Sequence, residues 1–313
     1  MRRWWVAMML AACGDNVDSQ ATGIWGANLA VADDTIFFTT YAEGPDKTDH
    51  AVWARPLVGG PDRKLWQGAP DGAFGTGMAV FDGRVYWPAW EGISEGEMPI
   101  IASAPSDGGE RTIDGALPSR NEVSGGVIVD ATGIYAAQSD AVTRLDRGGG
   151  GTTVLHSGTP GIRWIARDSG SLYVTTIEQN PRLLRLGAVS QELIASGQYT
   201  GTFAIADKVA YLGTNGAIVR VSLDGTTTGL TPLVVDGDAQ IVVAGAAGVF
   251  AVVTNRALGV NHDQIVRVAV DGSSPEVLRD GLEYVFALVL ADNHLVFAQC
   301  DCSAPGLIGV IEL

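Results

Sequence analysis

The fold of this chain is decided by a pattern seen clearly in MAVFDGRVYW, residues 78–87. An apolar stretch leads to an aspartate and a short turn, and a second apolar stretch ends in aromatic residues. Such a segment predicts two β-strands joined by a tight hairpin, because Asp-Gly readily adopts the positive φ angles of a two-residue turn. The pattern recurs about every 40 to 50 residues, which is the period of propeller blades. Its turn residue lies at Asp33, Asp82, Asp130, Asp168, Asp207, Gly245 and Asp292.

A second motif follows most copies of the first and supplies two more strands. It reads AIVRVSLDG at residues 217–225 and QIVRVAVDG at residues 264–272. Each repeat therefore holds four short strands, and no long stretch has the apolar spacing of an amphipathic helix. We expect an all-β chain that forms a single β-propeller of seven four-stranded blades, with six blades as the alternative if one terminal copy is not a blade. The last copy is incomplete, so residues around Thr22 to Trp25 are expected to pair as its outer strand and close the ring.

Composition supports one large, turn-rich domain. The chain has 313 residues, of which 41 are glycine, 46% are hydrophobic and 18% are charged. The hydrophobic share is enough for a large core, and the repeats assign residues 27–313 to one propeller. The formal net charge of −15 argues against nucleic acid or an anionic membrane surface as a main partner, because both require a basic face.

The N-terminus predicts export. MRRWWVAMMLAAC, residues 1–13, has a basic start and an apolar run too short to span a bilayer. Its end, Leu10-Ala11-Ala12-Cys13, resembles the lipobox of bacterial lipoprotein precursors, which implies a lipid on Cys13. We therefore expect a signal peptide at residues 1–12 and a tether at 13–26 that includes the ring-closing strand. An ordinary signal peptide with an incidental cysteine, or a buried N-terminal strand, is the alternative. The expected location is the bacterial cell envelope, at the outer membrane or the periplasmic face, with the lipid as the only membrane attachment.

The repeats resemble a known group of propellers. Asp-x-x-Val-Tyr-Trp at residues 82–87, and Ile-Val-Arg-Val-x-x-Asp-Gly starting at residues 218 and 265, are similar to repeats of the YWTD and TolB-like superfamily, in particular to uncharacterised bacterial propeller lipoproteins. The resemblance implies the fold and transfers no catalytic positions. Such propellers usually act as binding scaffolds, although some are lyases or other enzymes, so the fold alone leaves the function open.

The sequence assigns no catalytic residue, cofactor or metal. The zinc-protease, P-loop and CxxC motifs are absent. One GxSxG match around Ser94 lacks the strand-to-helix context of a nucleophile elbow. His50 and His262 fall in loops between second and third strands, where imidazole and nearby carboxylates could hold a metal. Solvated loop histidines are the favoured interpretation.

Cys300 and Cys302 form a close pair near the end of the chain. Paired cysteines in an exported protein are usually oxidised, although a disulfide across one intervening residue is strained. A local disulfide and a reduced thiol pair therefore both remain open, and a structural role in the last blade is favoured over a redox site.

Function is expected at one end of the ring, where the loops between second and third strands meet the links between blades. Exposed aromatic side chains with polar neighbours suit a protein, peptide or glycan ligand, although packing between blades would explain at least half of these aromatics. We expect a non-catalytic binding scaffold with a protein or peptide partner from the envelope. The alternatives are a lyase or hydrolase that uses loop histidines and acids at the channel mouth, and a purely structural envelope protein. The candidate binding face comprises Trp87, Trp90, Glu91, Trp164, Tyr199 and Tyr284.

Overall fold

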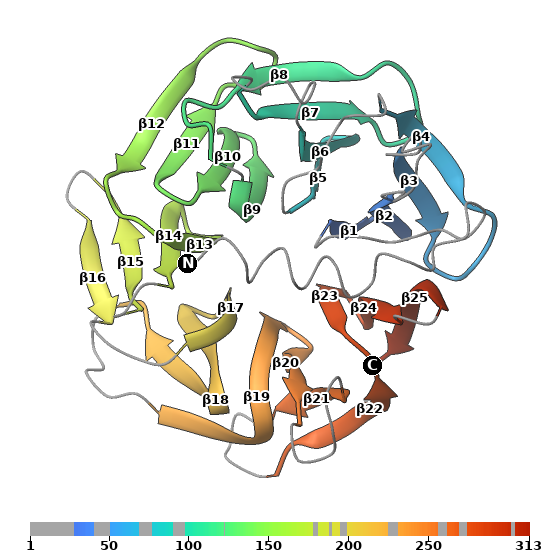
Figure 1. The fold of residues 1–313 in the computed structure, drawn as a ribbon, viewed down its shortest axis with the longest axis vertical. Helices are drawn as coiled ribbons and strands as arrows, with labels where there is room; N and C mark the ends of the chain where they lie inside the picture. The colour runs from blue at the N-terminus through green and yellow to red at the C-terminus, as the bar shows by residue number, and fades with distance from the viewer. Residues whose placement is uncertain are drawn as a thin grey trace.

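The protein is a ring of small antiparallel β-sheets, a β-propeller (Figure 1). It is seen in a computed structural model that describes residues 28–40, 51–68, 77–89, 98–121, 123–177, 181–187, 190–194, 199–224, 231–255, 262–268, 274–301 and 304–313. Every regular element of these residues is a strand, as the sequence predicts. Within the same ranges, no helix exists that could cross a membrane. The expected signal peptide, tether and ring-closing strand lie outside the described residues.

Four sheets have four strands each, in chain order from the inner to the outer strand. The first is β1 (Leu29–Ala32), β2 (Thr35–Thr40), β3 (Ala51–Pro56) and β4 (Arg63–Gln67). The second is β5 (Ala79–Phe81), β6 (Arg84–Ala89), β7 (Ile100–Pro105) and β8 (Thr112–Ala116). The third is β9 (Val123–Asp130), β10 (Gly133–Gln138), β11 (Ala141–Leu145) and β12 (Thr152–Ser157). The fourth is β13 (Ile162–Asp168), β14 (Ser171–Thr176), β15 (Leu183–Leu186) and β16 (Gln191–Ile194).

The remaining described strands form two further sheets. One has six strands: β17 (Tyr199–Ala206), β18 (Val209–Ser222), β19 (Thr231–Gly245), β20 (Gly248–Thr254), β21 (Asp263–Val268) and β22 (Glu276–Leu282). The other has three: β23 (Val285–Ala291), β24 (His294–Asp301) and β25 (Ala304–Glu312). The described residues thus form six sheets, which agrees with the alternative count, and seven separate four-stranded blades are not found among them. The difference arises because β18 and β19 are long strands that join two repeats into one sheet.

The inner strands surround the axis of the ring. Each contacts the next in the order β1, β5, β9, β13, β17, β19, β23, and β23 contacts β1 again. The core lies between neighbouring sheets, because each sheet packs both of its faces against the sheets beside it. For example, Tyr86 and Ile101 of the second sheet pack with Ile134 and Leu145 of the third. This arrangement explains why strands such as β6 and β10 are buried on both faces.

Candidate functional site

The two ends of the ring differ in how the chain turns. At one end, each inner strand is joined to the second strand by a two-residue turn, and we call this end the hairpin face. Asp33, Asp82, Asp207 and Asp292 have positive φ angles in these turns, a conformation that aspartate tolerates better than most residues. This confirms the predicted hairpins. The turns are residues 33–34, 82–83, 131–132, 169–170, 207–208, 246–247 and 292–293.

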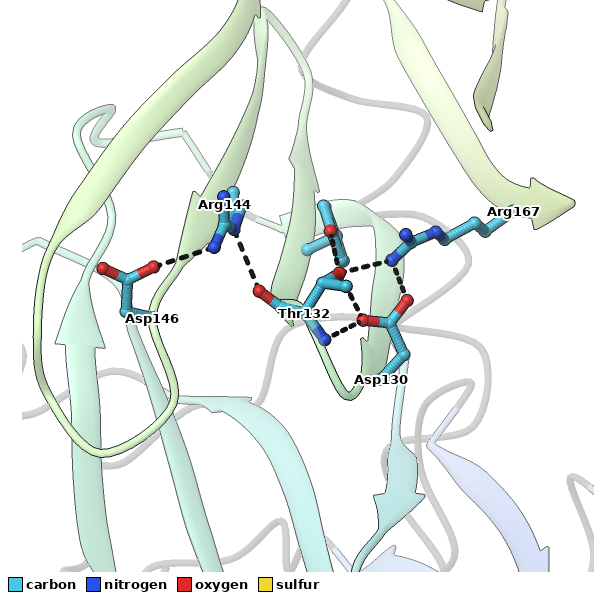
Figure 2. Close-up of polar contacts among 6 residues, drawn as sticks. Asp130, Thr132, Arg144, Asp146 and Arg167 are labelled. Carbon is cyan, nitrogen blue, oxygen red and sulfur yellow. Dashed lines mark hydrogen bonds and ion pairs between the residues drawn. The ribbon is translucent and has the colours of Figure 1, made fainter. Parts of the chain in front are cut away.

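A polar network on the hairpin face joins the third and fourth sheets (Figure 2). Asp130, at the end of β9, accepts hydrogen bonds from the backbone N–H and the hydroxyl of Thr132, both at 2.6 Å. Arg167 of β13 forms an ion pair with Asp130 and donates a hydrogen bond to the Thr132 hydroxyl at 3.0 Å. Its guanidinium also lies 4.7 Å from the centre of the Tyr135 ring. The ion pair with Arg167 thus connects the inner strands of the third and fourth sheets.

The same kind of link joins the second and third sheets. Arg147 contacts the carboxylate of Asp82 at 3.3 Å and lies 4.7 Å from the centre of the Phe81 ring. In both cases an arginine from the following sheet binds an aspartate in or beside the hairpin turn and covers an aromatic ring near the hairpin. The repeated aspartates therefore do more than form turns, because two of them also hold neighbouring sheets together.

A second network lies at the opposite face, where the six-stranded sheet meets the last sheet. Asp263, the first residue of β21, is buried. It accepts a hydrogen bond from the Thr254 hydroxyl at 2.6 Å and one from the Val285 backbone N–H at 2.7 Å. Since Val285 begins the inner strand of the last sheet, this carboxylate connects the two sheets. Burial raises the pKa of Asp263 above its ordinary value, and the two hydrogen bonds oppose this effect.

His262 lies beside Asp263 but forms a different contact. Its Nε2 atom is 2.8 Å from the carboxylate of Asp280. Asp280 also accepts hydrogen bonds from the Gln264 amide at 3.0 Å and from the Gly281 N–H at 2.7 Å. Hydrogen bonds from Gln264, His262 and Gly281, in that order, lower the pKa of Asp280. Among the described residues, no group of three or more histidines, cysteines or acids could hold a metal ion.

The pH dependence of stability gives a test of the Asp263 link. A carboxyl whose pKa is raised by folding contributes most to stability below its unfolded pKa, and this contribution is lost as the pH rises through the folded value. The Asp263→Asn variant lacks this titration. We therefore expect the free energy of unfolding of the native protein, relative to the variant, to fall between pH 4 and pH 7. Urea unfolding at both pH values measures the difference, and a difference that grows with pH would contradict the assignment.

One serine lies next to a histidine within the described part of the chain. Ser190 is 3.2 Å from His156 Nδ1, and His156 Nε2 is 2.8 Å from the Thr159 hydroxyl. Burial, and to a lesser extent the charge of Arg182, lowers the pKa of His156, so its neutral form is favoured. A hydroxyl thus occupies the place that a carboxylate takes in a catalytic triad, and His156 lies on the outer strand β12. The contact between Ser190 and His156 therefore does not support the alternative of a lyase or hydrolase.

Of the predicted binding-face residues, Trp87 is the clearest correction. Its side chain is 0% exposed and packs in the core with Trp66, whose ring centre is 5.7 Å away. It is buried because β6 is covered on both faces. Trp164 is partly buried against Leu183 and its neighbours, so it also packs between sheets. Tyr284 is partly buried, with a positive φ angle, in the link between β22 and β23.

The other predicted site residues lie partly or wholly outside the described part of the structure. Tyr199 and Cys300 lie within β17 and β24, but their side chains are outside the described part of the structure. The remaining residues lie outside it entirely, so the proposed grouping of histidines and acids at the channel mouth stays a prediction. They are Cys13, His50, Trp90, Glu91 and Cys302.

Sequence reasoning missed both structural networks. Asp263 lies in an alternating strand segment, and nothing there indicates that its carboxylate meets a backbone N–H from a strand that begins 22 residues later. A signal did exist for Arg147 and Arg167, because each falls near a hairpin and cations often pair with turn aspartates. The sequence does not tell which sheet such an arginine reaches.

Comparison with known proteins supports the fold and nothing narrower. No family model matches the chain, and no curated protein matches its sequence. A computationally designed protein, Ika8, is similar with a TM-score of 0.62 and 12% identity, over 94% of this chain and 85% of that one. A chain of a nidogen/laminin complex has a TM-score of 0.54 and 17% identity, over 74% and 90%. A prolyl endopeptidase structure has a TM-score of 0.62 and 11% identity, over 93% of this chain and 50% of that chain. The resemblance to the YWTD and TolB-like superfamily is therefore supported for the β-propeller fold, and not for that family or for its lipoproteins.

Proposed function

We propose that this chain is a lipid-anchored, exported β-propeller of the cell envelope that binds a protein or peptide and has no catalytic role. The propeller fold supports a scaffold or binding role. The lipobox-like Leu10-Ala11-Ala12-Cys13 supports the anchor. The binding surface in this proposal is the face opposite the hairpin face.

The difference between the two faces is the observation that carries the binding proposal. On the hairpin face the turns between first and second strands have two residues, and two aspartates in or beside these turns are bound by arginines of the next sheet. At the other face the chain between second and third strands is much longer in three sheets, at residues 41–50, 90–99 and 255–262. Long connections on a rigid framework are where binding residues are most often found.

Charge narrows the class of partner. The three long connections contain six acidic residues but only two Lys or Arg residues, Lys47 and Arg256; the acids are Glu43, Asp46, Asp49, Glu91, Glu95 and Glu97. The chain as a whole is also acidic, with a formal net charge of −15. Because association is favoured between complementary potentials, the partner in this proposal is a protein or peptide with a basic surface.

We also propose that the six-stranded sheet is two repeat units joined edge to edge, which would make seven units in all. Two observations support this. The pairing of β18 with β19 shifts register between Asn215 and Ala217, and the pairing of β19 with β20 shifts between Ala239 and Ile241. In addition, β17 and β19 both contact their neighbours as inner strands of the ring.

A fractionation and capture experiment tests the proposed function. The Cys13→Ala variant should move from the membrane fraction to the soluble fraction, since a thioether-linked lipid needs the thiol. The purified propeller should capture an envelope protein. The Trp90→Ala/Glu91→Ala variant should bind that protein with at least tenfold lower affinity. Lys208→Asn, in a turn of the hairpin face, is the matched control and should bind normally. If the Cys13→Ala variant stayed in the membrane fraction, the proposed anchor would be wrong. If Trp90→Ala/Glu91→Ala and Lys208→Asn lost the same affinity for the captured protein, the proposed binding face would be wrong.

A further inference from the structure

The long strand β18 contains a pair of residues that can react with each other. Asn215 is followed directly by Gly216, and no other asparagine of the chain precedes a glycine. In such a pair the backbone nitrogen of the glycine can attack the side-chain amide carbon of the asparagine. Any other residue in second place hinders this attack through its Cβ atom, which glycine lacks. The sequence therefore marks Asn215, and the fold decides whether the pair is protected.

The fold leaves this pair open. Asn215 and Gly216 are both exposed. Gly216 has a φ angle of 78°, and a Cβ atom built on it would meet nothing within 4 Å. The register with β19 also skips Gly216, because Asn215 is opposite Asp238 and Ala217 is opposite Val234. The attacking residue is thus neither covered by other side chains nor matched to a partner residue across the sheet.

The pair lies at the face opposite the hairpin face. β18 begins at the hairpin turn 207–208, and the chain returns to this turn after β18, because the Leu223 N–H bonds to the Lys208 carbonyl oxygen at 2.9 Å. The middle of β18, which contains Asn215, is therefore the part of the strand farthest from that turn. Gly216 supplies the left-handed residue at this point, a conformation that glycine adopts without strain.

We propose that Asn215 is a site of spontaneous deamidation in the folded protein. The Gly216 nitrogen forms a bond to Asn215 Cγ, the bond from Cγ to Nδ2 breaks, and ammonia leaves with the proton that the Gly216 nitrogen gives up. The product is a five-membered succinimide ring. Water then opens the ring at either of its carbonyl carbons and leaves aspartate or isoaspartate at position 215. The reaction consumes one water molecule, and no electrons are transferred to or from another reactant.

The new carboxylate would join a row that already contains acids. Residues paired across neighbouring strands lie side by side on one face of the sheet, and the row from Asn215 continues with Asp238, Thr254 and Asp263 on β19, β20 and β21. Like charges directly opposite each other destabilise an antiparallel pair. Deamidation therefore weakens the pairing of β18 with β19, where two repeats are joined into one sheet. Isoaspartate has the same charge and also lengthens the backbone at the register shift.

Peptide mapping by mass spectrometry tests the site. The purified protein is kept in warm buffer at neutral pH, in one sample folded and in another unfolded in guanidinium chloride. We expect the Asn215 peptide of the folded protein to convert to aspartate and isoaspartate at a rate within tenfold of the unfolded rate. Asn293, an exposed asparagine followed by His294, is the internal control and should convert at least tenfold more slowly than Asn215.

Three results of the mapping would overturn the proposal. The first is conversion of Asn215 more than tenfold slower in the folded than in the unfolded protein, which would show that the fold protects the pair. The second is conversion no faster than that of Asn293. The third is a product without isoaspartate, because only the succinimide ring yields both forms.

The Asn215→Asp variant tests the effect on the junction of β18 and β19. It contains the aspartate product and should lower the Tm by about 1–3 °C, the size expected for one pair of like charges across two strands. Asn215→Ser is the matched control, since it changes the same side chain without adding charge. In the Asp238→Asn background, Asn215→Asp should cost less than half of this shift. Equal Tm values for Asn215→Asp and Asn215→Ser, or a shift unchanged by Asp238→Asn, would show that the proposed repulsion is wrong.

Discussion

Replacement of Trp87 by alanine is expected to destabilise the protein by about 3–5 kcal/mol, the usual cost of truncating a large buried aromatic residue. The Trp87 side chain is 0% exposed and packs between the first and second sheets with Val52, Leu65 and Ala102. Alanine would leave a cavity that the surrounding strands cannot close without losing their own pairing. Thermal unfolding should show the Tm lowered by roughly 10 °C or more.

The conservative variant distinguishes this core role from ligand binding. The Nε1 atom of Trp87 is buried and has no hydrogen-bond partner among the described atoms. Trp87→Phe removes that unsatisfied donor together with some packing volume, so the two effects partly offset each other. We expect Trp87→Phe to retain most of the stability lost in Trp87→Ala. If Trp87→Ala kept its Tm and lost only ligand capture, Trp87 would be a binding residue after all.

The hairpins could be predicted from the sequence because their signal is local. An apolar strand, a two-residue turn and a second apolar strand occupy about ten consecutive residues, and Asp or Gly at the turn satisfies a backbone requirement that no distant contact can alter. All seven predicted hairpins are found, from β1–β2 to β23–β24. The number of sheets could not be predicted in the same way. The number of sheets depends on whether a strand ends at Asn215 and at Asp236. In the structure both strands run through these residues, as β18 and β19.

The candidate site was harder to predict because a propeller sheet has no solvent-exposed face in its middle strands. Alternation along a strand normally separates core residues from surface residues. Here Val85, Tyr86 and Trp87 are consecutive and all buried, on alternating faces. An aromatic residue near the end of a strand therefore cannot be assigned to the surface from its sequence position. Likewise, the burial of Asp263 depends on contact with β23, which only the folded ring brings close.

The second large effect is expected at Gly213 of β18, where two strands of the six-stranded sheet approach each other closely. Gly213 is buried in β18, and its φ angle is not in the left-handed region, so its conformation alone would tolerate any residue. Space is the constraint. A Cβ atom at this position would overlap with the backbone carbonyl oxygen of Ala239 in β19. Because that atom belongs to a paired strand, it cannot rotate away as a side chain could.

Gly213→Ala should therefore force β17–β18 apart from the later half of β19. We expect a loss of about 3 kcal/mol, at the upper end for overpacking, and a Tm lowered by roughly 5–10 °C. Gly151→Ala is the matched control. The nearest atom to a Cβ there is the Asp146 carboxylate oxygen at 3.3 Å, on an exposed side chain that can move. Urea unfolding of both variants measures the difference. If the Gly213→Ala protein were as stable as the Gly151→Ala protein, the close contact between Gly213 of β18 and Ala239 of β19 would be absent.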